Sequence, residues 1–117
     1  MSRVAALLLT LLLFSVSVAL EAKGNAERGK AKAAQKSGNQ QACAECHGAD
    51  GGTPTEKDRP ILAGQHADYL VKALLDYKSG KRVNAVMNGI AQPLTRQEIE
   101  DLAAWFSSQH SKLHFQR

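Results

Sequence analysis

The clearest chemical signal in the sequence is a pair of cysteines three residues apart, with a histidine directly after the second one. Cys43, Cys46 and His47 stand in the stretch Cys-Ala-Glu-Cys-His. This order is typical of covalent c-type haem attachment. Residues three apart lie on the same side of a helical turn, so both thiols can reach one porphyrin while the imidazole binds its iron. The motif predicts one haem c, bound covalently through Cys43 and Cys46, with His47 as an iron ligand.

Other chemistries also use a Cys-x-x-Cys pair. It occurs in thiol–disulfide redox proteins, as half of a zinc site, or as a plain disulfide. The sequence holds only these two cysteines, and a bridge between them would close a very small loop and stabilise little. A haemless thiol-redox or zinc protein remains the alternative, and it predicts no visible absorbance after export with the haem-attachment machinery.

A second iron ligand is expected downstream of this motif, at Met87. This residue is the only methionine besides Met1, and it lies in a stretch that contains glycine and proline. A His/Met pair keeps iron six-coordinate, the ligation used for electron transfer. The ordinary alternative is a methionine packed in the core. The competing ligands are the remaining histidines, His66, His110 and His114. None of them is as well placed, because the first lies at a helix start and the others lie near the carboxyl end.

The segment between the haem motif and the next helix is expected to be an irregular loop. Residues 48–60 are rich in glycine, proline and charge, with no apolar periodicity. An axial histidine normally donates its other ring N–H to a carbonyl group, which fixes the ring. Pro60, just before the apolar Ile61 and Leu62, is the candidate for that carbonyl. The alternative is that Pro60 only makes a turn rigid.

The amino terminus has the pattern of an export signal. Arg3 precedes an apolar run, and small residues follow at the positions that a signal peptidase reads. Residues 1–19 are therefore predicted to be a signal peptide, with cleavage as late as Ala22 as an alternative. An uncleaved membrane anchor is disfavoured, because the apolar run is marginal against the roughly 20 residues that span a bilayer. Residues 20–117 would then form one soluble periplasmic domain.

Composition and charge fit a small cofactor-binding domain. The 117 residues carry 15 Lys+Arg against 11 Asp+Glu, a net charge of +4. No basic run stands out, which argues against a nucleic-acid partner. A domain of this size buries only about 60–65% of its unfolded surface, and aromatic residues are few. A covalently held porphyrin would supply the missing apolar volume.

Three helices are predicted from capping signals and apolar periodicity. The first follows Asn25 and covers residues 26–36, and the second covers residues 67–79 and ends at Gly80. The third follows a capping box at residues 95–98 and has an apolar face. No strand pattern occurs, so the fold class is predicted to be all-α, with about three to four helices around one haem.

Taken together, these stretches resemble bacterial class I c-type cytochromes of the small monohaem periplasmic type, and they are similar to the single-haem halves of dihaem periplasmic cytochromes. The resembling stretches are residues 24–30, 43–51, 60–65, 69–82, 87–91 and 94–106. They cover nearly all of the chain after the signal. One departure is the segment from Gln35 to Gln41, which is longer than usual for the family.

The resemblance implies a cytochrome c-like fold and a role for each matching position. Cys43 and Cys46 would form the thioethers, His47 would be the proximal ligand and Met87 the distal one. Pro60 would accept a hydrogen bond from His47. The resemblance also implies that Gly29, which sequence pattern alone leaves open as a surface glycine, lets the first helix cross the last near Leu102 and Trp105.

Electron transfer, and not catalysis, follows from that ligation. A His/Met iron leaves no open position for a substrate, so the chain is expected to be an electron carrier with redox proteins as partners. Basic residues are candidates for a ring around the haem edge that attracts an acidic partner, or they are simply solvated: Lys57, Lys72, Lys78, Lys81 and Arg82. The alternative function is a haem c subunit bound permanently to a dehydrogenase or a sulfur-oxidising enzyme.

Overall fold

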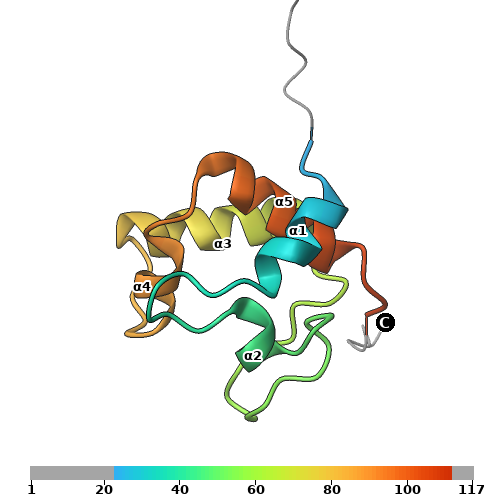
Figure 1. Cartoon of the computed structure of the whole chain (residues 1–117), viewed down its shortest axis with the longest axis horizontal. Helices are drawn as coiled ribbons and strands as arrows, with labels where there is room; N and C mark the ends of the chain where they lie inside the picture. Colours follow the sequence, from blue (N-terminus) through green and yellow to red (C-terminus); the bar gives the residue numbers. More distant parts are fainter. Residues whose placement is uncertain (1–22, 112–117) are drawn as a thin grey trace, which may run out of the picture.

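The computed structural model describes residues 23–111, so the predicted signal peptide at residues 1–19 lies outside the described part of the chain. The described residues form five helices: α1 (Ala26–Ala33), α2 (Cys43–His47), α3 (Ala67–Ser79), α4 (Met87–Ala91) and α5 (Arg96–Ser107) (Figure 1). Between residues 23 and 111 there is no strand, and extended pairing is limited to an isolated bridge between Ser37 and Gln40. The all-α prediction is confirmed. The two helices beyond the three predicted ones, α2 and α4, have five residues each.

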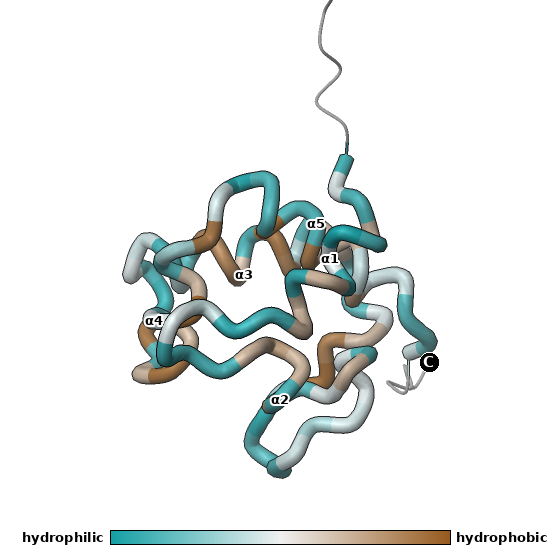
Figure 2. The backbone as a smooth tube through the Cα atoms, viewed as in Figure 1, coloured by the Kyte–Doolittle hydropathy of each residue, from teal (hydrophilic) through white to brown (hydrophobic). Residues whose placement is uncertain are grey.

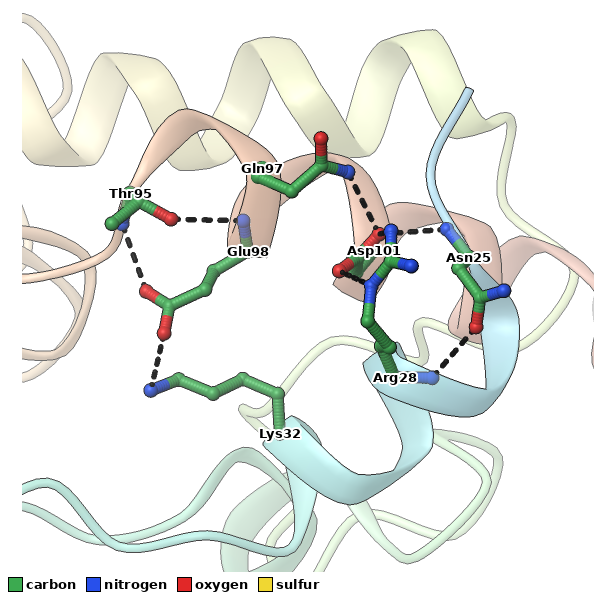
Figure 3. A network of polar contacts seen from close by, with 7 residues as sticks. All are labelled: Asn25, Arg28, Lys32, Thr95, Gln97, Glu98 and Asp101. Atoms are coloured by element: carbon green, nitrogen blue, oxygen red, sulfur yellow. Dashed lines mark hydrogen bonds and ion pairs between the residues drawn. The ribbon is translucent and has the colours of Figure 1, made fainter. Parts of the chain in front are cut away.

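The long helices begin and end where local chemistry favours it. The Asn25 side chain accepts a hydrogen bond from the Arg28 N–H at the start of α1. At α5 the predicted capping box is present, with Thr95 Oγ1 3.1 Å from the Glu98 nitrogen and the Glu98 carboxylate 2.9 Å from the Thr95 nitrogen (Figure 3). Helix α3 ends at Gly80, whose φ of 81° is left-handed and favours glycine. Helix α1 is shorter than predicted and ends at Ala33.

Helices α1 and α5 pack with their backbones almost in contact. A Cβ atom on Gly29 would lie 1.9 Å from the Asp101 carbonyl oxygen and 2.8 Å from Trp105 Cβ. A Cβ atom on Gly24 would lie 1.8 Å from the Glu100 carbonyl oxygen. Only glycine fits at such distances. Gly29 therefore permits the crossing of α1 and α5, and its closest neighbour there is Asp101.

A buried carboxylate strengthens this crossing. Asp101 is 4% exposed and accepts hydrogen bonds from the Asn25 N–H at 2.7 Å and from Arg28 Nε at 2.8 Å (Figure 3). The hydrogen bond from Arg28 is the main reason why the pKa of Asp101 falls to about 2. A second ion pair joins Lys32 of α1 to Glu98 of α5 at 3.0 Å. The two ends of the described chain are thus joined by polar contacts as well as by close packing.

The apolar core lies between α5, α3 and the end of α1. Its buried members are Ala33, Leu70, Leu94, Ile99, Leu102, Ala103 and Phe106. Figure 2 shows hydrophobic backbone segments at α3, α4 and α5, whereas the long loop after α2 is coloured white to teal over most of its length. Cys43 and Leu62 also pack against this core, so it continues toward the haem motif.

Candidate functional site

A cavity of about 280 Å³ opens beside the core. All five residues that sequence reasoning assigned to the cofactor line it: Cys43, Cys46, His47, Pro60 and Met87. They come from α2, from the loop before α3, and from α4. Much of the remaining lining is apolar and comes from α3, α4 and α5: Leu70, Ala73, Leu74, Ile90, Leu102, Ala103 and Phe106. The structure therefore brings residues 40 positions apart, His47 and Met87, to one cavity.

The haem motif forms the single turn of α2, as its spacing predicted. The Glu45 carboxylate accepts a hydrogen bond from the Ala42 N–H at 2.6 Å and pairs with Lys36 at 3.0 Å. The Ala42 N–H lies at the helix start and has no partner within the helix, so the Glu45 carboxylate supplies its acceptor. The middle residue of the motif thus stabilises the turn on which Cys46 and His47 are carried.

The thiols do not have the environment of a redox-active pair. Cys43 and Cys46 are both free, and burial raises the pKa of the Cys43 thiol. Thiol–disulfide exchange requires a thiolate, which a lowered pKa favours, so the shift at Cys43 disfavours this chemistry. Within residues 23–111 no three His, Cys, Asp or Glu side chains gather in a metal-binding group. The described residues therefore do not form a four-ligand zinc site.

His47 is held in the form that binds a metal. Its Nδ1 lies 2.9 Å from the Pro60 carbonyl oxygen, and its side chain is almost fully buried. Burial lowers the pKa of His47, which keeps the ring neutral. Because a carbonyl oxygen only accepts hydrogen bonds, Nδ1 carries the proton and the Nε2 lone pair is free. Of the other histidines, His66 and His110 are exposed and do not line the cavity, and His114 lies outside the described residues.

Two asparagines that sequence reasoning missed fix the segment around Met87. Asn84 Oδ1 accepts a hydrogen bond from the Met87 N–H at 3.0 Å. Asn88 Oδ1 accepts from the Asn84 N–H at 2.7 Å, and its Nδ2 donates to the carbonyl oxygens of Tyr77 and Arg82, each at 2.8 Å. The glycine and proline residues around Met87 predict a loop, but Met87 is the first residue of α4. Asn84 thus gives an acceptor to the N–H at the start of this short helix, and Asn88 ties the helix to the end of α3.

The comparison with protein families decides what kind of site this is. The cytochrome c family model matches residues 26–110, which include the haem motif and Met87. The chain belongs to the cytochrome c family. The resemblance drawn from its motifs is confirmed, because residues 26–110 form a cytochrome c domain.

Similar proteins are bacterial cytochromes and cytochrome subunits. The chain is 44% identical over 103 residues to cytochrome c4 of Pseudomonas aeruginosa, which covers 88% of this chain and 46% of that protein. It is 36% identical over 72 residues to the cytochrome subunit of sulfide dehydrogenase of Chlorobaculum tepidum, covering 62% of this chain and 64% of the subunit. The solved cytochrome c4 of Acidithiobacillus ferrooxidans has a TM-score of 0.63 at 39% identity, covering 71% of this chain and 49% of that one. The chain spans about half the length of these cytochromes c4.

The residues that line the cavity of this cytochrome c domain fit a covalently attached haem. The two free thiols lie on one helical turn, next to a buried histidine with Nε2 unprotonated. A thioether at Met87 and apolar side chains complete the cavity. One lining residue that sequence reasoning did not assign is Arg59, whose Nε is buried without a hydrogen-bond partner among the described residues. Arg59 lies in a charged stretch of the sequence, where no pattern distinguishes it from a solvated arginine.

Proposed function

We propose that this protein is a periplasmic monohaem c-type cytochrome that passes single electrons between redox proteins. Cys43 and Cys46 would hold one haem c through thioether bonds, and His47 and Met87 would be the two iron ligands. The observation that carries the proposal is that these four residues line one largely apolar cavity. Once bound there, the haem supplies one-electron redox chemistry.

The surrounding residues prepare the ligands for this role. The Pro60 carbonyl keeps the His47 proton on Nδ1, so that Nε2 would be available to the iron as a neutral donor. Asn84 and Asn88 hold the backbone at Met87. Apolar side chains of α3 and α5 keep water from the cavity, which disfavours charge on its contents and so influences the reduction potential. Because His47 and Met87 would both bind the iron, no position would be open for a substrate, so the proposed role is not enzymatic.

A partner would dock where the cavity meets the surface. Tyr69 and Val86 line the cavity and are 48% and 43% exposed, and Val83 nearby in the chain is 85% exposed. Lys81 and Arg82 precede these valines and are also exposed. Apolar contacts with basic neighbours suit a small, transient interface with an acidic redox protein, of below about 1,200 Å² in total.

The proposed location rests on the sequence of the amino terminus, where residues 1–19 have the signal-peptide pattern. In residues 23–111 no helix is long and apolar enough to cross a membrane. The second candidate function is a cytochrome subunit held permanently by a dehydrogenase, which the likeness to the sulfide dehydrogenase subunit favours. Purification from the native host separates the two, because a subunit elutes with a stoichiometric partner and a free carrier elutes alone.

The absorption spectrum of the exported protein tests the ligation. We expect a low-spin c-type spectrum that survives acid–acetone extraction, together with the far-red band of a methionine–iron bond. Met87→Ala should abolish the far-red band, while His110→Ala, at an exposed position outside the cavity, should retain it. Persistence of the band in Met87→Ala would show that another residue is the ligand. A protein that matures without visible absorbance would support the haemless alternative.

A further inference from the structure

One buried polar atom of the cavity wall has no partner in the protein. Arg59 Nε is the one buried side-chain nitrogen or oxygen in residues 23–111 without a hydrogen-bond partner. Buried donors are nearly always satisfied in folded proteins, because an unsatisfied one loses its hydration without compensation. Its nearest charged partner is weak, since Arg59 Nη2 lies 3.6 Å from Glu56 Oε1 and the Glu56 side chain is 63% exposed.

Arg59 lies in the cavity wall, next to the residue that holds His47. It directly precedes Pro60, whose carbonyl holds the His47 ring, and its own N–H bonds to the Glu56 carbonyl oxygen at 3.2 Å. Hydrogen bonds therefore fix the backbone at Arg59 and at Pro60. Asp58 lines the same cavity, so an anionic and a cationic side chain lie together in a wall that is largely apolar.

We propose that Arg59 binds a carboxylate of the porphyrin, with Nε as a hydrogen-bond donor. This inference rests on the proposed function, because it takes haem c as the occupant of the cavity. Haem carries two propionate carboxylates, and a guanidinium is the side chain best suited to bind a carboxylate by charge-assisted hydrogen bonds. The carboxylate then accepts a hydrogen bond from Arg59 Nε, and the guanidinium keeps that carboxylate ionised in a largely apolar cavity. Besides Arg59, the ionisable side chains that line the cavity are those of Cys43, Cys46, His47, Asp58, Tyr69, Tyr77 and Arg82. Glu56 faces Arg59 from outside the lining.

The midpoint potential of the holoprotein, measured as a function of pH, tests the proposal. An opposite charge within reach lowers a carboxyl pKa by about 1–3 units, so Arg59→Gln should raise the redox-linked pKa by about that amount. Arg59→Lys keeps the charge and should show a smaller shift. Arg96→Gln removes an equal charge from the exposed face of α5, where Arg96 pairs with Glu100 at 2.8 Å, and should leave the profile unchanged.

Two further results decide the matter. Glu56→Gln should behave like the parent, and equal effects of Glu56→Gln and Arg59→Gln would mean that Arg59 serves only Glu56, which overturns the proposal. In the reduced parent protein, the Arg59 Nε–H should exchange slowly and show a nuclear Overhauser contact to propionate protons. Its absence overturns the proposal even where Arg59→Gln does not mature. A parent without a c-type spectrum would instead refute the proposed function.

Discussion

Replacement of Asn88 by alanine tests how the protein holds Met87. The change removes the hydrogen bonds from Nδ2 to the Tyr77 and Arg82 carbonyl oxygens and the one from the Asn84 N–H to Oδ1. Each bond contributes about 0.5–1.5 kcal/mol net, and because two of the three are exposed to solvent, we take a total of about 2 kcal/mol. At 1.4 kcal/mol per factor of ten, the balance between bound and released Met87 shifts about 30-fold toward release.

Titration of the oxidised holoprotein with imidazole measures this shift. Imidazole binds only where the iron has lost Met87, so its apparent dissociation constant is the intrinsic one divided by the fraction released. We expect the constant to fall about 30-fold in Asn88→Ala, because the released fraction rises by that factor. Asn88→Asp keeps the oxygen acceptor and loses both donors, and should give an intermediate value.

The matched control is Asn39→Ala, an exposed asparagine in the turn between α1 and α2. It should bind imidazole like the parent. The reasoning is refuted if Asn88→Ala also binds like the parent while its far-red band is intact, since the three hydrogen bonds would then contribute nothing to the position of Met87.

Two other predictions concern the crossing of α1 and α5. Gly29→Ala should lower the free energy of unfolding by about 1–3 kcal/mol, measured by chemical denaturation. The reason is that a Cβ atom 1.9 Å from the Asp101 carbonyl oxygen forces the helices apart. Unchanged or increased stability would mean that the two helices can move apart at no cost in free energy. Arg28→Gln should raise the pKa of Asp101 from about 2 toward its usual 3.8, observed by carbon-13 NMR of the carboxyl group. Since the folded pKa is depressed, the parent gains stability from this carboxylate above about pH 4 and loses it as the pH falls toward 2, and Arg28→Gln should lose most of that dependence. An unmoved pKa in Arg28→Gln would assign the shift to the hydrogen bonds from the Asn25 N–H and the Gln97 side chain.

Much of the fold could be predicted because its signals are local. The second predicted helix, residues 67–79, has the observed bounds, since its apolar periodicity ends at a glycine that adopts a left-handed conformation. The capping box of Thr95 and Glu98 is a contact between residues three apart, and it is present as predicted. The predicted end of α1 lies beyond the observed one, because residues that favour a helix continue through Lys36 while the observed helix stops at Ala33.

The candidate site could be predicted only where a motif carries it. The attachment motif names Cys43, Cys46 and His47 by type and spacing, whereas Met87 was inferred from the small number of methionines. Asn88 and Arg59 have no such signal, because an asparagine beside a glycine indicates a turn and an arginine in a charged loop indicates a solvated side chain. The role of Asn88 depends on its hydrogen bond to the carbonyl oxygen of Tyr77, 11 residues away. The role of Arg59 depends on a cavity that several segments form together.

The crossing of α1 and α5 also has a consequence for chain length. These two helices join the ends of the described chain, so every residue that lines the cavity before α5 belongs to one long loop that the crossing closes. The entropic cost of closing a flexible loop grows only with the logarithm of its length, at about 0.6 kcal/mol for a doubling. A few extra residues between α1 and α2 are therefore nearly neutral. The long segment from Gln35 to Gln41 lies where insertions cost least, because Asp101 and Gly29 fix one side of it and the haem motif the other.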